Sequence, residues 1–364
     1  MMDKKQRIKP NILPNTKLSK KLLNNIIAQI ETAKSHVALY TNSALVMLYW
    51  NVGKLLNHEI LNNNRAEYGE QILPQLAEEL TSLYGNGFDR PNLSRMVKFS
   101  KLYSQEICVT LSQQLSWSHI IRLISIDDEI KRNFYAEMCR LERWSVRTLR
   151  QKIDNMLFER TTIAKKPESV ITLEIEKLKA GDLNNPDLYL QDPYILSFLK
   201  AKTISSEADL EQAILDELQL FIQELGSDFC FIARQKRMST ENNDRYLDLL
   251  FFHRGMRRLI AIELKMTSFQ PEHAGQMEWY LKWLDKYERK ENEEKPLGII
   301  ICAGKDQEDI ELLELDKNGI HVAGYLTELP QKDLIEHKLR QAIVLARENY
   351  NKKLIDKESV IYFV

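Results

Sequence analysis

Glycine, proline and cysteine are all scarce in this sequence of 364 residues. Only 12 glycines and 10 prolines are present, which favours helices joined by short loops over a turn-rich β fold. The four cysteines show no CxxC or Cys/His spacing, and they are Cys108, Cys139, Cys230 and Cys302. The sequence therefore lacks the signature of a structural zinc site and predicts four reduced thiols in a cytoplasmic protein.

Long apolar runs are also missing. No stretch approaches the length needed to span a bilayer, and the opening residues Met1–Lys5 lack the apolar core of a signal peptide. We therefore expect no membrane interaction.

The charge is close to neutral overall but unevenly distributed. Residues 1–170 hold 25 Lys and Arg against 17 Asp and Glu, a net charge of +8. Residues 171–364 hold the remaining 26 Lys and Arg against 35 Asp and Glu, a net charge of −9. A basic N-terminal half is the half expected to meet nucleic acid.

Hydrophobic periodicity predicts an α+β chain with two domains. We expect a flexible arm at 1–16, a helical domain at 17–160, a linker at 161–205, an α/β domain at 206–350 and a tail at 351–364. In the second domain the pattern predicts helix 207–225, strand 228–236, a hairpin at 245–265, helix 272–289, strand 297–302, helix 306–316, strand 319–325 and helix 331–350.

A helix-turn-helix arrangement is predicted around residue 85. It consists of a helix ending near Tyr84, a turn at 85–87 and a second helix from about residue 88. The second helix is predicted to expose side chains suited to phosphates and base edges, namely Arg90, Asn92, Ser94, Arg95 and Lys98. An αα-hairpin with a solvated face is the alternative.

A second basic cluster surrounds Trp144. It includes Arg147 and Arg150, which are candidates for contact with a phosphate backbone. A solvated helix surface is the alternative, and it is the commoner meaning of such a run.

The predicted hairpin carries charged groups in strands that are otherwise apolar. Alternation along the second strand places Glu263 and Lys265 on one face, and an antiparallel pairing across the turn at 254–256 brings Asp248 opposite Glu263. Buried carboxylates are costly without a partner. Two carboxylates with the Leu264 carbonyl offer the hard oxygen ligands that Mg²⁺ prefers. A structural ion pair inside the sheet is the alternative explanation.

This αβββαβ order, with Asp248 followed by Glu263-Leu264-Lys265, resembles the PD-(D/E)xK nuclease superfamily. Gln276 and Tyr280 on the following helix are similar to the extra Q-x-x-x-Y motif of RecB-type members, and at i and i+4 they share one helix face. The resemblance implies a restriction-endonuclease-like domain with a central mixed sheet and a site that binds Mg²⁺ or Mn²⁺.

The resemblance extends to bacterial YhcG-type proteins over nearly the whole chain. In the second domain it rests on the segments Phe221–Gly226, Arg234-Gln235, Tyr246–His253 and Pro271–Gln276. In the first domain it rests on Tyr49–Gly53, Gly87-Phe88, Asn92-Leu93, Leu115–His119 and Trp144–Leu149. It implies a winged-helix-like N-terminal module that binds nucleic acid or partners. It also implies that the acidic residue of the first helix is Glu224, with Glu217 as the alternative.

The resulting hypothesis is a metal-dependent endonuclease that hydrolyses phosphodiester bonds, with DNA favoured over RNA. Asp248, Glu263 and the Leu264 carbonyl would bind the metal, Lys265 would stabilise charge, and Gln276 and Tyr280 would hold water or phosphate. Arg234 and Gln235 would contact the backbone nearby. The alternatives are a catalytically silent nucleic-acid-binding or assembly module, or a subunit of a restriction, defence or DNA-processing complex. Besides nucleic acid, the expected partners are a second copy of the chain or the members of such a complex.

Overall fold

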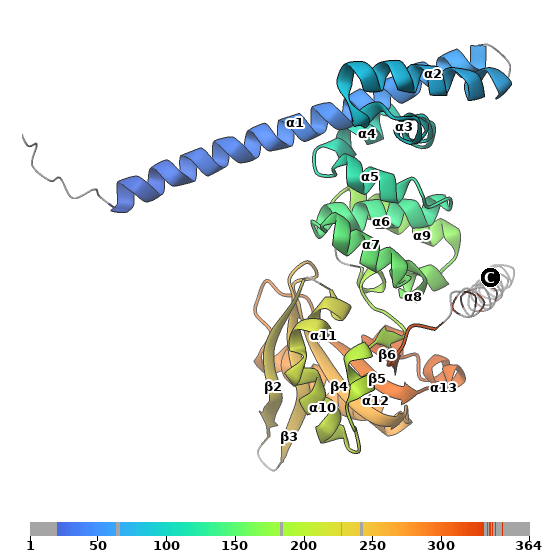
Figure 1. Ribbon diagram of the computed structural model, residues 1–364. Coiled ribbons are helices and arrows are strands. Elements are labelled where there is room, and N and C mark those ends of the chain that lie inside the picture. Colours follow the sequence, from blue (N-terminus) through green and yellow to red (C-terminus); the bar gives the residue numbers. More distant parts are fainter. Residues whose placement is uncertain are drawn as a thin grey trace, which may run out of the picture. The chain divides into compact units, whose positions relative to one another are not determined.

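The computed structural model describes residues 20–62, 66–182, 185–226, 228–240 and 243–330, with isolated positions beyond (Figure 1). The arm predicted at 1–16, the tail predicted at 351–364 and most of the helix predicted at 331–350 lie outside these residues. The chain divides into two compact units, one up to Ile120 and the other from Ile121 onward. In the described part of the chain, no helix is both long and apolar enough to cross a membrane.

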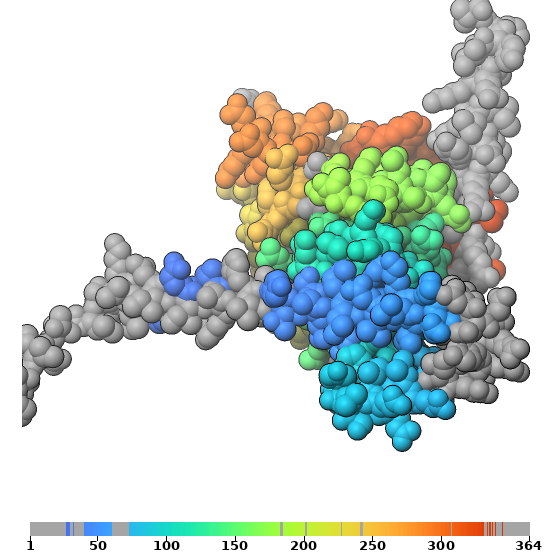
Figure 2. Space-filling view, turned by 90° about the horizontal axis from the view of Figure 1, so that it is seen from above, coloured from blue at the N-terminus to red at the C-terminus, as the bar shows by residue number. Residues whose placement is uncertain are grey.

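Unit 1 is built from α1 (Lys20–Asn62), α2 (Ala66–Tyr84), α3 (Arg90–Leu102), α4 (Gln105–Ser112) and the start of α5 (Trp117–Leu123). Helices α1 and α3 approach closely at Gly53, where an added Cβ would lie 1.9 Å from the Met96 carbonyl oxygen. Leu93 and Met96 of α3 and Tyr49 of α1 are buried in one cluster beside this crossing. In Figure 2 the described part of α1 (blue) lies against the light-blue segment of the same unit.

The predicted helix–turn–helix corresponds to α2, a turn at Gly85 and α3. Gly85 has a φ of 88°, a left-handed value that favours glycine, and the Asp89 carboxylate caps α3 by accepting from the Asn92 N–H at 2.8 Å. Over residues 20–62 and 66–160 the structure contains no β-strand. The expected wing is therefore not found there, because these residues are used in helices, and helix-turn-helix function stays a prediction.

Unit 2 begins with α6 (Glu129–Leu141), α7 (Val146–Asp154), α8 (Leu157–Arg160) and α9 (Glu168–Lys179). The sequence pattern predicts a domain boundary near residue 160. In the structure these four helices belong to the same compact unit as the sheet. The segment expected to be a linker, 161–205, contains α9 and the short strand β1 (Tyr194–Ile195), which pairs in parallel with Tyr325 and Leu326. A two-residue strand is too short to show periodicity, so the sequence pattern does not reveal it.

A six-stranded mixed sheet forms the centre of the rest of unit 2 (Figure 1). Its elements are α10 (Glu207–Asp216), α11 (Leu218–Leu225), β2 (Phe229–Ser239), β3 (Asp244–His253), β4 (Arg258–Ser268), α12 (Pro271–Tyr287), β5 (Leu297–Gly304), α13 (Gln307–Leu312) and β6 (Ile320–Leu326). The strand order is β1-β6-β5-β4-β3-β2. The β2–β3–β4 pairs are antiparallel and the β4–β5–β6–β1 pairs are parallel, as the αβββαβ pattern predicts. Strand β2 is an outer strand, and its register with β3 shifts between Phe231 and Ala233.

Helices cover both faces of this sheet. Met277 and Tyr280 of α12 are buried against Leu250 and Ala261, while Phe221 of α11 stacks on Phe251, with ring centroids 6.1 Å apart. Since residues 250 and 251 are consecutive in one strand, they point to opposite faces. Asp248 of β3 and Glu263 and Lys265 of β4 therefore lie between the layers of a three-layer fold. Charged groups in such a position need partners that offset the cost of removing them from water.

Acidification is expected to destabilise unit 2 through two buried histidines. Burial lowers the pKa of both His253 and His321 to about 4, while in the unfolded chain histidine has a pKa of about 6.5. The unfolded chain therefore takes up protons first as the pH falls. The free energy of unfolding should decrease by about 1.4 kcal/mol per pH unit per histidine between pH 6.5 and 4, and be unaffected by them at higher pH.

Urea unfolding at pH 7.5, 6 and 5, followed by circular dichroism, measures this slope. In a variant that carries both His253→Phe and His321→Gln, the loss of stability over the same window should be clearly smaller than in the wild type. A double variant that loses stability in parallel with the wild type would rule these residues out as the cause.

Candidate active site

The site forms where β3 and β4 separate. Their paired register runs to Leu249 opposite Ile262, and one further step places Asp248 opposite Glu263, as predicted. The Leu264 N–H donates to Asp248 Oδ2 at 2.9 Å. The N–H and C=O of one strand residue point to the same edge, so the Leu264 carbonyl faces the Asp248 side as well.

Helix α12 holds Glu263 from the next layer. Gln276 Nε2 lies 2.9 Å from Glu263 Oε1 and 2.8 Å from the Tyr280 hydroxyl, and that hydroxyl donates to the Tyr246 carbonyl at 2.7 Å. The helix comes this close because Gly298 has no side chain: an added Cβ would lie 2.5 Å from Met277 Cγ. The predicted motif Gln276 and Tyr280 thus joins Glu263 in one hydrogen-bonded chain.

Lys265 completes the group from the same strand. Its Nζ lies 3.1 Å from Glu263 Oε1 and 3.4 Å from Glu207 Oε2 on α10. Burial lowers the pKa of Lys265, but the charges of Glu263, Glu207 and Asp248 outweigh burial and raise it. The side chain is therefore a cation at neutral pH.

The two carboxylates repel each other in a dry environment. Burial, followed by the charge of Asp248, raises the pKa of Glu263 to about 7, and burial also raises the pKa of Asp248. Glu263 Oε2 is buried and makes no hydrogen bond within the described residues. A structural ion pair with Lys265 explains only one oxygen of Glu263, so the arrangement favours a further cation.

The first-helix acid differs from both residues that the sequence suggested. Glu224 does not reach Asp248: its Oε1 accepts from Arg160 Nη1 at 2.5 Å and from the Ile195 N–H at 2.8 Å. Glu217 lies at the break between α10 and α11, where the predicted single helix 207–225 is interrupted. The structure instead brings two acids of α10 to the site, Glu211 near Asp248 and Glu207 beside Lys265.

Glu211 is tied to Asp248 through Gln235. The Gln235 Nε2 group donates to Glu211 Oε2 at 2.5 Å and to Asp248 Oδ1 at 3.0 Å. Gln235 has a φ of 41°, which is rare for a residue other than glycine, and strained backbone of this kind gathers at functional sites. Helical spacing did not identify Glu211, because 211 and 217 are both acids of one amphipathic segment and only the sheet shows which one lies beside Asp248.

Replacing Glu211 and Glu217 in turn by glutamine tests which of the two acts at the site. We expect Glu211→Gln to lower the predicted phosphodiester cleavage about tenfold or more, because it removes a carboxylate that would attract the metal ion and that holds Gln235 against Asp248. Glu217→Gln is the matched control and should leave activity unchanged. Rates of cleavage of a labelled duplex measure both, and a larger loss in Glu217→Gln would refute the assignment of Glu211.

The residues expected to touch nucleic acid fall into two groups. Six of them are exposed: Arg90, Arg95 and Lys98 on α3, Arg147 and Arg150 on α7, and Arg234 on β2. Gln235 is half-buried, and its amide donates to Glu211 and Asp248, so its contact with the nucleic-acid backbone stays a prediction. Asn92 is buried: its amide donates to the Gly87 carbonyl and its Oδ1 accepts from Trp117 Nε1 at 2.9 Å. The expectation for Asn92 is therefore wrong, because the side chain links α3 to α5 instead of facing solvent.

Family models match both parts of the chain. A model described as the YhcG PDDEXK nuclease domain matches residues 187–341, and one described as the DUF1016 N-terminal domain matches residues 25–160. YhcG of Escherichia coli (strain K12) is 28% identical over 363 residues, which cover 91% of this chain and 96% of YhcG.

Solved structures give weaker similarity. A repair endonuclease from Pyrococcus abyssi is 22% identical, with a TM-score of 0.26, over 36% of this chain and 51% of that chain. EndoMS in a complex with double-stranded DNA is 19% identical, with a TM-score of 0.26, over 36% and 50% respectively. The chain thus spans about half the length of the solved structures that it matches.

Proposed function

We propose that this chain, which is similar to the YhcG PDDEXK nuclease domain over residues 187–341 and to the DUF1016 N-terminal domain over residues 25–160, is a metal-dependent endonuclease acting on DNA. The observation that carries this proposal is the cluster of the buried Glu263 with the half-buried Asp248 and Lys265, held by Gln276 and Tyr280 from one side and by Gln235 from the other.

The residues fit a divalent cation of the Mg²⁺ or Mn²⁺ type. Asp248 and Glu263 supply hard oxygen donors, and the buried, unpartnered Glu263 Oε2 is an atom that a cation would satisfy. Among the described residues no group of three or more His, Cys, Asp or Glu side chains has the spacing of a complete metal centre, so the Leu264 carbonyl would serve as a further ligand. When bound, the ion would polarise the scissile phosphate and lower the pKa of a water.

The other side chains orient the metal-binding carboxylates, stabilise charge on the phosphate or bind the nucleic-acid backbone. Lys265, a cation 3.1 Å from Glu263, stabilises negative charge that develops on the phosphate. Gln276 fixes the orientation of Glu263 and is itself fixed by Tyr280. Arg234, exposed beside Gln235 on β2, contacts the nucleic-acid backbone, and the basic side chains of α3 and α7 contribute binding outside the site.

Cleavage assays test this function directly. Purified protein is incubated with supercoiled plasmid, linear duplex, single-stranded DNA and RNA, in Mg²⁺, Mn²⁺ or EDTA. We expect nicking or linearisation of circular DNA with metal and none with EDTA. Cleavage of RNA alone would contradict the DNA assignment, and binding without cleavage in every metal would favour a catalytically silent module or a subunit that needs a partner.

A further inference from the structure

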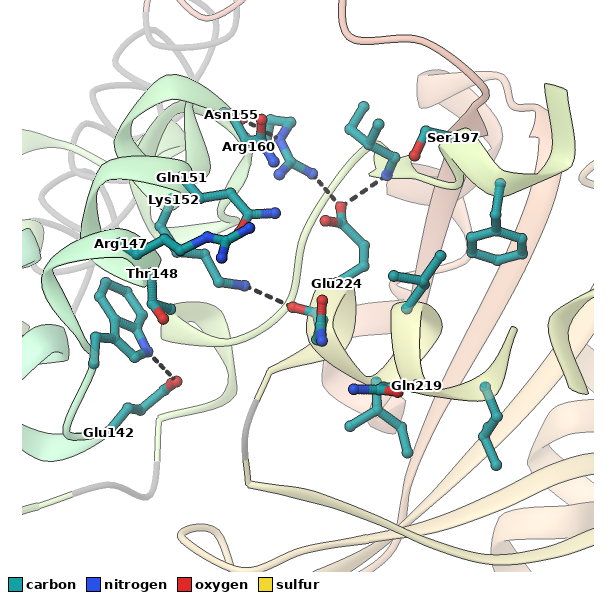
Figure 3. Close-up of a pocket in the computed structure, with 17 residues that line it drawn as sticks. Glu142, Arg147, Thr148, Gln151, Lys152, Asn155, Arg160, Ser197, Gln219 and Glu224 are labelled. Carbon is teal, nitrogen blue, oxygen red and sulfur yellow. Dashed lines mark hydrogen bonds and ion pairs between the residues drawn. The ribbon is translucent and has the colours of Figure 1, made fainter. Parts of the chain in front are cut away.

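A second pocket lies in unit 2 and shares no residue with the active site. It has a volume of about 920 Å³, within the range of roughly 300–1,000 Å³ typical of small-molecule sites. Helix α7 and the end of α8 form one wall, and α11 with residues 195–198 forms the other. Figure 3 shows Arg147, Gln151 and Lys152 extending from α7 into the space that Gln219 and Glu224 border from α11.

The charges in this pocket do not balance. Three cationic side chains line it, Arg147, Lys152 and Arg160, against two carboxylates, Glu142 and Glu224. Arg160 is 1% exposed and is neutralised by Glu224, which lies 2.5 Å away. Glu142 accepts from the Trp144 indole N–H at 2.7 Å. Arg147 and Lys152 therefore face the pocket with no carboxylate within ion-pair distance among the described residues.

Lys152 is the more constrained of the two cations. Its Nζ donates to the Gln223 carbonyl at 2.8 Å, a neutral acceptor on the opposite wall. Burial lowers the pKa of Lys152 although Glu224 and Glu142 act in the opposite direction. A partly buried ammonium group that has no carboxylate in direct contact is costly, and an anion bound in the pocket would offset that cost.

The remaining lining is suited to a planar, partly polar group. Apolar side chains come mainly from the α11 wall: Leu218, Leu220, Ile222, Ile195 and Phe198. Amides come from both walls, Gln151 and Asn155 from one and Gln219 and Gln223 from the other. Amides donate and accept together, as the edge of a nucleobase does, while apolar side chains pack on its face.

We propose that this pocket binds a nucleoside monophosphate, with the phosphate between Arg147 and Lys152 and the base between the amides and the apolar wall. The proposal does not depend on nuclease activity. A nucleic-acid strand carries the same phosphate chemistry. Arg150 distinguishes the two ligands, because it lies outside the pocket, where a strand but not a mononucleotide would reach it. It lies three residues from Arg147 on α7 and lines only a smaller neighbouring hollow, together with Arg147 and Gln151.

Calorimetric titration of the full chain in EDTA tests the proposal, with AMP, adenosine and inorganic phosphate as probes. We expect AMP to bind at least about tenfold more tightly than adenosine, because a charge-assisted contact contributes more than one tenfold step. Arg147→Gln and Lys152→Met should each weaken AMP at least about tenfold. Arg150→Gln, the matched control, should stay within about twofold of the wild type.

Three results would overturn the proposal. Equal affinity for AMP and adenosine would exclude a phosphate site. Loss of AMP binding in Glu263→Gln but not in Arg147→Gln would place the nucleotide in the nuclease site instead. A 12-nucleotide DNA strand that binds with equal dependence on Arg147 and Arg150, where AMP does not bind, would assign these cations to a strand. Thermal unfolding of each variant confirms folding, and the exposed Arg147 is the substitution least able to disturb it.

Discussion

Asp248→Asn and Glu263→Gln are each expected to reduce DNA cleavage at least about a thousandfold. Both substitutions preserve shape and remove one charge, and each removes an oxygen that would bind the cation. The loss should therefore appear in kcat at saturating metal and DNA, not in DNA affinity. A gel assay of plasmid nicking over several decades of enzyme concentration measures the first quantity, and a filter-binding assay in EDTA measures the second.

The Glu263→Gln variant should lose activity without losing thermal stability. Because burial and Asp248 raise the pKa of Glu263 to about 7, its charged form is disfavoured in the fold, and neutral glutamine removes that repulsion. Glu263→Gln should unfold at the same temperature as the wild type or higher in EDTA. An inactive variant that is also less stable would show that Glu263 is a structural ion-pair partner of Lys265.

Glu224→Ala should have the second-largest effect, and it should act on stability. Arg160 is 1% exposed, and its Nη1 also donates to Gln191 Oε1 and to the Pro193 carbonyl. Removing Glu224 would leave this guanidinium buried without its counter-ion, at a cost of about 3–5 kcal/mol. Chemical denaturation monitored by circular dichroism gives the value.

The double variant distinguishes this cost from other effects of the substitution. Arg160→Met combined with Glu224→Ala removes both charges, so it should recover part of the stability lost in Glu224→Ala alone. A simple sum of the two single effects would mean that the pair is not coupled. If folded Glu224→Ala also loses cleavage to the same degree as Glu263→Gln, then Glu224 belongs to the chemistry, as its sequence context suggested.

The hairpin and its charged residues are predictable from sequence because they break a local rule. Strands β3 and β4 are apolar runs, so Asp248, Glu263 and Lys265 stand out. Alternation together with the antiparallel pairing across a short turn brings them together. The i, i+4 spacing of Gln276 and Tyr280 is equally local. These features need no knowledge of how distant elements pack.

Glu211, Glu224 and Asn92 depend on packing and are not predictable in the same way. Many acids in 207–225 are compatible with one amphipathic helix, and the interruption at Glu217 changes which of them faces the sheet. In the sequence, Asn92 looks like a surface residue of a basic helix. In the structure its Oδ1 accepts a hydrogen bond from the indole of Trp117, which is 25 positions away in the chain. Tertiary contacts of this kind leave no periodic signal.

The outer position of β2 has a consequence for how the protein behaves in concentrated solution. An unpaired strand edge is a template onto which a strand of another molecule can add. Here the register shift between Phe231 and Ala233 interrupts the edge, and cationic side chains follow at Arg234, Lys236 and Arg237. The irregular backbone and the charged side chains, which pair with Glu211, Glu288 and Asp244, both oppose the addition of another strand. The same basic edge that would approach DNA thus protects the molecule from aggregation through its sheet.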